Sequence, residues 1–149
     1  MIRTVVTKRL EIDAGHRLLR HEGKCRNLHG HRYAFEVSVE ADGLDSVGRV
    51  VDFSVVKAKV GGWLDEHWDH GFLLQADDPL VPVLTGDAGF GPDSKHFIVD
   101  CPPTAENLSR LVYERAVELL EEHGVRVVAV RCYETPTCWA DYQPPEAAQ

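Results

Sequence analysis

Three histidines lie where two alternating segments of this 149-residue chain approach each other, and their spacing suits a metal ion. His16 ends the segment Leu10–His16, in which apolar and charged residues alternate as in a strand with one buried face. His29 and His31 begin the segment His29–Val39, which alternates in the same way. Strands that are neighbours in sequence usually pair antiparallel, so the end of the first should lie beside the start of the second. The pattern therefore predicts that the three imidazoles meet at one end of a sheet.

Three imidazole nitrogens with an open fourth position are typical of catalytic zinc, with ligand distances of about 2.0–2.1 Å. A lone histidine at a strand end is more often an ordinary surface or core residue. His29 and His31 are separated by a single residue, and His16 is expected on the same face of the sheet, so the pattern favours the metal site instead. We therefore expect His16, His29 and His31 to bind zinc.

A cysteine lies in the connection between the two segments. This connection, Arg17–Leu28, is longer than the usual hairpin loop of about 2–5 residues, and long loops in compact domains are often functional. Lys24 and Arg26 flank Cys25 and would favour its thiolate, which could act as a base or a nucleophile. An inert buried thiol and a fourth metal ligand are the alternatives.

Three other positions carry weaker signals. In the pair Asp69 and His70, a carboxylate could orient an imidazole, although polar surface residues would look the same. Glu134 ends a predicted strand; if buried, it would need a cationic or amide partner. Glu106 lies in the first turn of a predicted helix, where a carboxylate also simply stabilises the helix.

The elements that would position these residues follow from hydrophobic spacing and from capping residues. One helix should begin after Ser54 and a second after Thr104, the latter ending at Gly124. Their apolar stripes are Val56, Val60, Trp63 and Leu64 in the first, and Leu108, Leu111, Val112, Ala116, Leu119 and Leu120 in the second. Besides the two histidine-bearing segments, the predicted extended pieces are Gly48–Phe53, His96–Asp100, Val125–Tyr133 and Cys138–Tyr142. The stretch Gly71–Ser94 should be irregular with a short helix or turn, and Gln143–Gln149 a loose tail.

Composition limits the classes of function. The length and a 44% hydrophobic content suit one domain, residues 1–149. A net charge of −8 argues against a nucleic acid or an anionic membrane as the main partner. The sequence has no apolar run near the roughly 18–20 residues of a membrane span and no signal-peptide core, so we expect a cytoplasmic protein. The four cysteines form no CxxC pair, and we expect no disulfides.

Short motifs spread over nearly the whole chain resemble the 6-pyruvoyl-tetrahydropterin synthase / 6-carboxy-tetrahydropterin synthase family. The Cys-x-x-x-His-Gly-His element of CRNLHGH is the most specific of them. In chain order the motifs are AGHRL at 14–18, CRNLHGH at 25–31, VDF at 51–53, DH at 69–70, PTAEN at 103–107 and YET at 133–135.

The resemblance implies an α+β tunnelling fold of order ββααββ. Its four-stranded antiparallel sheet would carry two helices on one face, and His96–Asp100 would be an extra strand in an insertion. Such chains form trimers, usually stacked as hexamers, with the active sites between subunits. The long stretch between His70 and Pro103 departs from the shortest members of the family.

The resemblance also implies roles for single residues. His16, His29 and His31 would hold zinc, Cys25 would take the substrate proton, and Asp69 with His70 would form a relay. Glu134 would anchor the pterin ring through its amino group and ring N–H, and Thr104 and Glu106 would also contact substrate.

Of the two branches of the family, we favour the carboxy-forming one. It cleaves the side chain of dihydroneopterin triphosphate, releases acetaldehyde and triphosphate, and feeds 7-deazaguanine and queuosine biosynthesis. The alternatives are the pyruvoyl-forming branch, which eliminates triphosphate, and a zinc-stabilised scaffold of the same fold without catalysis.

Overall fold

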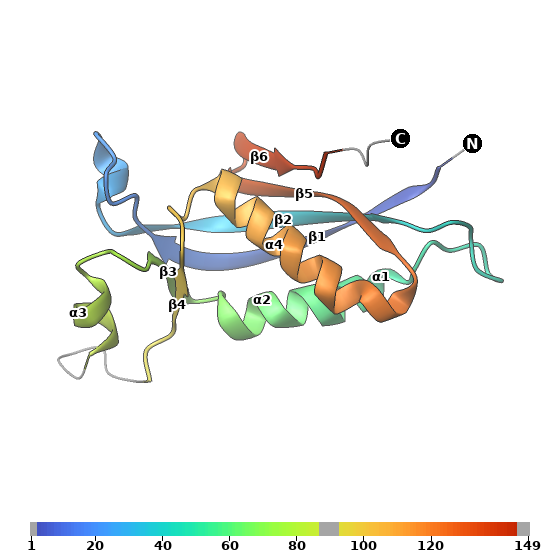
Figure 1. The fold of residues 1–149 in the computed structure, drawn as a ribbon, viewed down its shortest axis with the longest axis horizontal. Coiled ribbons are helices and arrows are strands. Elements are labelled where there is room, and N and C mark those ends of the chain that lie inside the picture. Colours follow the sequence, from blue (N-terminus) through green and yellow to red (C-terminus); the bar gives the residue numbers. More distant parts are fainter. Residues whose placement is uncertain (1–2, 87–92, 146–149) are drawn as a thin grey trace.

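A computed structural model describes residues 3–86 and 93–145, which form one six-stranded sheet in the order β4-β3-β1-β2-β5-β6 with helices on one side (Figure 1). Four strands are antiparallel neighbours, and β3 and β4 extend the sheet beyond β1 in parallel. The strands are β1 (Val5–His16), β2 (His29–Glu40), β3 (Gly71–Gln75), β4 (His96–Val99), β5 (Arg126–Thr135) and β6 (Cys138–Tyr142).

The pairing of β1 with β2 confirms the prediction from alternation. Their register runs without interruption from Val5 opposite Glu40 to His16 opposite His29. The core-facing residues of both strands are buried, and they include Leu10, Ile12 and Ala14 on β1 and Tyr33, Phe35, Val37 and Val39 on β2. The predicted parity therefore places His16, His29 and His31 on the core-facing side at one end of the sheet.

Two helical segments cover this face. Helix α1 (Phe53–Val56), a π-helical stretch (Lys57–Gly61) and α2 (Gly62–His67) follow one another without a break, and α4 (Ala105–Leu120) packs against β5, β6 and that π-helical stretch. The predicted apolar stripes face the core. Val56, Val60, Leu64, Leu108, Val112, Ala116 and Leu120 are almost fully buried, and Trp63, Leu111 and Leu119 are partly buried against them.

The helix ends agree with the sequence except at one cap. Thr104 accepts a hydrogen bond from the Asn107 N–H, and Gly124 ends a final 3-10 turn with a φ of 66°. The first helix is not capped by Ser54 as predicted. Asp52 takes that place, and its carboxylate accepts the Ser54 N–H at 2.8 Å. A carboxylate is as good an N-cap as a hydroxyl, so both residues were eligible.

The sheet corrects the expectation of four strands with one extra. The predicted strand near His96 is confirmed as β4, but β3 was missed, because GFLLQ is a continuous apolar run without alternation. Runs of this kind are typical of parallel strands buried on both faces. The stretch Gly48–Phe53 is not a strand; Asp45 instead closes a turn by accepting the N–H groups of Val47 and Arg49.

The remaining segments are short. Helix α3 (Val81–Thr85) is the short helix expected between β3 and β4, and residues 143–145 are irregular as expected of a tail. The rest of that tail, 146–149, and the glycine-rich stretch 87–92 lie outside the described residues. No helix within the described ranges is long and apolar enough to cross a membrane. The single-domain organisation over residues 1–149 stays a prediction.

Candidate metal and substrate site

The three predicted histidines come together at the end of β1 and β2. Their ring centroids are 4.6 Å apart for His16 and His29, 5.1 Å for His16 and His31, and 5.0 Å for His29 and His31. One ring nitrogen of each lies within 4.8 Å of the others. Such nitrogens need only small rotamer changes to reach the roughly 2.0–2.1 Å distances of a shared zinc ion.

Backbone carbonyls fix the ring orientation of two of these histidines. His16 Nδ1 lies 2.7 Å from the Pro103 carbonyl oxygen, and His29 Nδ1 lies 2.6 Å from that of Asn27. A carbonyl oxygen only accepts, so each Nδ1 carries the proton and each Nε2 keeps its lone pair. The two Nε2 atoms face each other at 3.2 Å. Two lone pairs aimed at one point suit a shared cation, and the carbonyls are the outer partners that metal-bound histidines commonly have.

Burial keeps two of these rings uncharged. His16 is 1% exposed, and loss of hydration together with the neighbouring histidines lowers its pKa from 6.5 to about 4, against the opposing hydrogen bond to Pro103. The pKa of His31 is also lowered, mainly by burial, although Glu134 acts in the other direction. Neutral imidazole is the form that binds metal, so burial favours the metal-binding form of His16 and His31.

Acidic and phenolic groups continue the site along β2 and β5. A Glu134 carboxylate oxygen lies 3.7 Å from His31 Nε2, and the Glu134 side chain is about a quarter exposed at 27%. The rings of Tyr33 and His31 meet edge to face at 5.4 Å. The Tyr33 hydroxyl is buried without a hydrogen-bond partner among the described residues, and burial with the nearby Glu134, Cys132 and Cys25 raises its pKa. The alternation of β2 could have indicated this tyrosine, but only as a core residue.

Cys25 lies on a 3-10 turn, Lys24–Arg26, in the loop between β1 and β2. A hydrogen bond of 2.9 Å from the Leu18 N–H to the Cys25 carbonyl oxygen closes this loop. The thiol is partly buried and forms no disulfide. The Cys25 thiol also contributes to the raised pKa of Tyr33, whose ring packs against His31.

Asp69 and His70 form the hydrogen-bonded pair that adjacency alone did not guarantee. His70 Nδ1 donates to an Asp69 carboxylate oxygen at 2.8 Å, and the other carboxylate oxygen accepts the Asp13 N–H at 2.9 Å. His70 has a φ of 59°, the one positive value at a non-glycine residue in the described part of the chain. Such backbone strain is most often retained at functional positions. Despite burial, the hydrogen bonds from Asp13 and His70 lower the pKa of Asp69.

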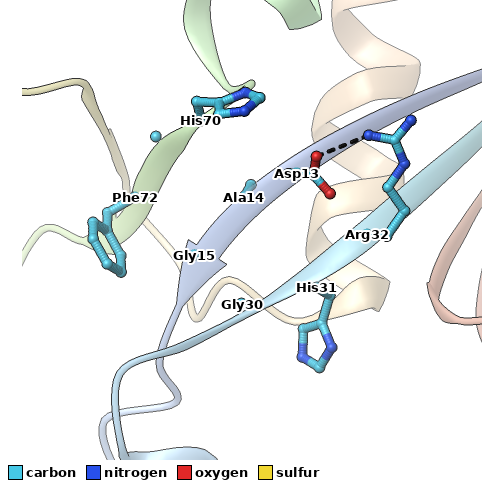
Figure 2. Close-up of a pocket in the computed structure, with 9 residues that line it drawn as sticks. Asp13, Ala14, Gly15, Gly30, His31, Arg32, His70 and Phe72 are labelled. Atoms are coloured by element: carbon cyan, nitrogen blue, oxygen red, sulfur yellow. Dashed lines mark hydrogen bonds and ion pairs between the residues drawn. The ribbon is translucent and has the colours of Figure 1, made fainter.

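The sheet separates this pair from the three histidines within one chain. Asp13 pairs with Arg32 across the strands on the face that the helices leave open, and the Asp69–His70 pair is bound to the Asp13 backbone. In Figure 2, His70 and His31 point away from each other on either side of β1 and β2. The pocket drawn there is lined by both histidines, by Gly15 and Gly30, and by Phe72, whose ring lies where a side chain on Gly15 would be.

The start of α4 contributes the two other predicted substrate contacts. The Thr104 hydroxyl accepts the Asn107 N–H at 3.2 Å and is therefore already engaged as a helix cap. Glu106 lies near the buried thiol of Cys132, whose pKa is raised by burial and by the charges of Glu134 and Glu106. Two carboxylates therefore face the same part of the sheet beside the histidines. The sequence had no signal for the Pro103 carbonyl, which holds His16 from this same segment.

An α+β fold with three convergent histidines beside a carboxylate defines a candidate metal-dependent enzyme, and comparison with known proteins specifies its family. The model of the 6-pyruvoyl tetrahydropterin synthase family matches residues 5–145. The chain belongs to this family, as the motifs suggested.

Two curated relatives from different bacteria are similar to the chain over most of its length. The 6-carboxy-5,6,7,8-tetrahydropterin synthase of Rickettsia bellii is 37% identical over 137 residues, covering 91% of this chain and 96% of the relative. The synthase of the same name from Aquifex aeolicus is 35% identical over 157 residues, covering 93% and 96%.

Solved structures confirm the fold. An uncharacterized protein from Wolinella succinogenes superimposes with a TM-score of 0.83 at 24% identity, covering 96% of this chain and 99% of that one. The 6-pyruvoyl tetrahydropterin synthase of Caenorhabditis elegans gives 0.68 at 20% identity, with 97% of each chain covered.

Proposed function

We propose that the protein catalyses the 6-carboxy-5,6,7,8-tetrahydropterin synthase reaction, in which dihydroneopterin triphosphate and one water give the 6-carboxy product, acetaldehyde and triphosphate. The observation that carries the proposal is the three-histidine cluster with Glu134 3.7 Å from His31. The names of the Rickettsia and Aquifex relatives favour the carboxy-forming branch over the pyruvoyl-forming one.

Zinc is the metal that fits the histidine cluster best, because all three ligands are imidazoles and an open position is left for substrate. His16, His29 and His31 would hold the ion. When bound, zinc supplies Lewis-acid chemistry that lowers the pKa of the substrate's side-chain hydroxyl groups.

The chain's own groups bind the pterin and move protons. The Glu134 carboxylate accepts hydrogen bonds from the amino group and the ring N–H of the pterin in a bidentate contact. Glu106 and Thr104, at the start of α4, would make further contacts with the substrate. Cys25, on the loop next to the metal ligands, takes the proton from the substrate side chain. Asp69 accepts a hydrogen bond from His70 Nδ1–H, which leaves His70 Nε2 free to accept and return a proton.

The complete site forms between subunits in this proposal. Asp69 and His70 lie on the opposite face from the histidine cluster, so His70 would serve the cluster of a neighbouring chain. Within the described chain, β3 pairs with β1 only at Ala14–His16 and the Asp13 backbone is bound by Asp69 and His70, which leaves the edge from Val5 to Ile12 unpaired. Open edges of this length are usually covered by association. A trimer or hexamer is expected by light scattering, and a monomer at working concentration would contradict it.

Product analysis with dihydroneopterin triphosphate is the direct test. We expect acetaldehyde and triphosphate in equal amounts. Glu134→Gln keeps the shape of the side chain and one acceptor oxygen but loses one of the two charge-assisted hydrogen bonds, worth about 1.5–3 kcal/mol, so turnover at low substrate should fall by about tenfold to a hundredfold. Glu118→Gln, on the exposed side of α4 where Glu118 pairs with Arg115, is the matched control and should leave turnover unchanged.

The products also distinguish the alternatives. Formation of the pyruvoyl product without acetaldehyde would place the protein in the other branch of the family. An oligomeric, zinc-loaded protein that turns over no pterin triphosphate would instead be a scaffold.

A further inference from the structure

An ion pair with a buried carboxylate joins the loop of Cys25 to the segment that follows β3. Arg17 Nε donates to one carboxylate oxygen of Asp78 at 2.6 Å, and Arg17 Nη2 donates to the other at 2.5 Å. The second oxygen also accepts the Leu80 N–H at 2.8 Å. Asp78 is 3% exposed, and its pKa is lowered chiefly by the hydrogen bond from Arg17.

The position of Arg17 in the chain gives this pair its importance. Arg17 directly follows the predicted metal ligand His16 and directly precedes Leu18. The Leu18 N–H donates to the Cys25 carbonyl oxygen at 2.9 Å and so closes the loop on which the thiol lies. Arg17 is therefore the link between the metal ligand and the closure of the Cys25 loop.

Asp78, which lies in the insertion just after β3, restrains Arg17. Its own N–H donates to the Gln75 carbonyl oxygen at the end of β3, so the carboxylate is fixed to the sheet. A buried pair with two parallel hydrogen bonds restrains Arg17 far more than an exposed pair would. The chain offers that comparison three residues along the loop: Arg20 reaches Asp77 at 3.1 Å, but both side chains are more than half exposed.

We propose that Asp78, acting through Arg17, is a positioning residue that holds the Cys25 thiol beside the three-histidine cluster. The inference rests on the proposed function insofar as Cys25 is the proton acceptor. The insertion after His70 would then contribute to catalysis, because the turn after β3 carries the Asp78 carboxylate that restrains Arg17 and the Cys25 loop.

The variant Asp78→Asn keeps the size of the side chain and removes its charge. We expect kcat to fall roughly tenfold to a hundredfold, because small displacements of a reacting group have effects of that size. KM and metal content should not change, since Glu134 and the histidines are untouched. Asp77→Asn is the matched control and should leave kcat, KM and metal content as in the wild type.

A chemical readout makes the test independent of turnover. Alkylation by iodoacetamide, followed at each cysteine by peptide mass spectrometry, should be at least several-fold faster at Cys25 in Asp78→Asn than in the wild type. Rates at Cys101 and Cys138 are the internal references and should stay the same. If the wild type has no synthase activity, the proposed function fails while this measurement still tests the positioning.

Two results would overturn the inference. One is a folded Asp78→Asn protein with unchanged kcat and unchanged Cys25 alkylation. The other is loss of metal in parallel with activity, because the pair would then support His16 rather than the thiol. Should Asp78→Asn fail to fold, Arg17→Lys keeps a charge but only one point of contact, and it should show the same kcat and alkylation changes to a smaller extent.

Discussion

Acid should destabilise the metal-free protein through His16. In the native state this ring is 1% exposed and its pKa is lowered from 6.5 to about 4. Between these two pH values His16 is protonated in the unfolded chain but stays neutral in the native chain. The free energy of unfolding therefore falls as the pH is lowered through this window, and below about pH 4 the effect is complete.

The size of the effect follows from the two pKa values. At about 1.36 kcal/mol per pKa unit, the difference between 6.5 and about 4 corresponds to roughly 3 kcal/mol. Typical domains have only about 5–15 kcal/mol of stability in total, so this is a large fraction.

Urea unfolding of the protein in a chelator, from about pH 7 down to about pH 4, measures the effect. The reference is His16→Asn, because its side-chain amide can still donate to the Pro103 carbonyl oxygen but does not titrate. Across this pH range, the free energy of unfolding of the wild type should fall by roughly 3 kcal/mol more than that of the variant. Equal losses in both proteins would refute the assignment of a buried, neutral imidazole to His16.

Three further predictions concern metal, catalysis and the helix. His31→Ala should remove most of the bound zinc, which metal analysis of the purified protein would show. Cys25→Ala should keep the zinc and lose turnover; loss of zinc would instead indicate a fourth ligand. Gly62→Ala should raise the free energy of unfolding by about 1 kcal/mol in thermal or urea unfolding, because Gly62 is helical with open space around it. Gly61→Ala should not, since its added carbon would lie 3.1 Å from Leu10.

The histidine cluster could be predicted from the sequence because it depends only on strand parity and antiparallel pairing. Both are local properties of the segments around His16 and His29, and the observed register places these two residues opposite each other. The apolar stripes of the helices were predictable for the same reason. Such patterns follow from burial of one face and need no knowledge of the rest of the fold.

Other features could not be predicted because they depend on contacts between distant segments. The hydrogen bond between Asp69 and His70 needs a positive φ at His70, and the Asp13 backbone anchors the pair. Nothing in the local sequence specifies either. The strand β3 was missed for a related reason, since its apolar run becomes recognisable as a strand only beside β1 and β4. Asp78 likewise cannot be distinguished from the neighbouring acidic residues by sequence, because its partner Arg17 lies far away in the chain.

The distant contacts also imply that metal binding and folding are coupled. His16 is oriented by the Pro103 carbonyl oxygen, from a residue 87 positions later in the chain, just before α4 begins. His29 is oriented by its neighbour Asn27, and a local bond of this kind can form in a short segment. The orientation of the His16 ring is therefore fixed only when the segment before α4 lies against the sheet, so the unfolded chain holds no preformed site. Binding energy then adds to the stability of the whole fold, and the metal should raise the unfolding temperature of the whole described domain in one transition.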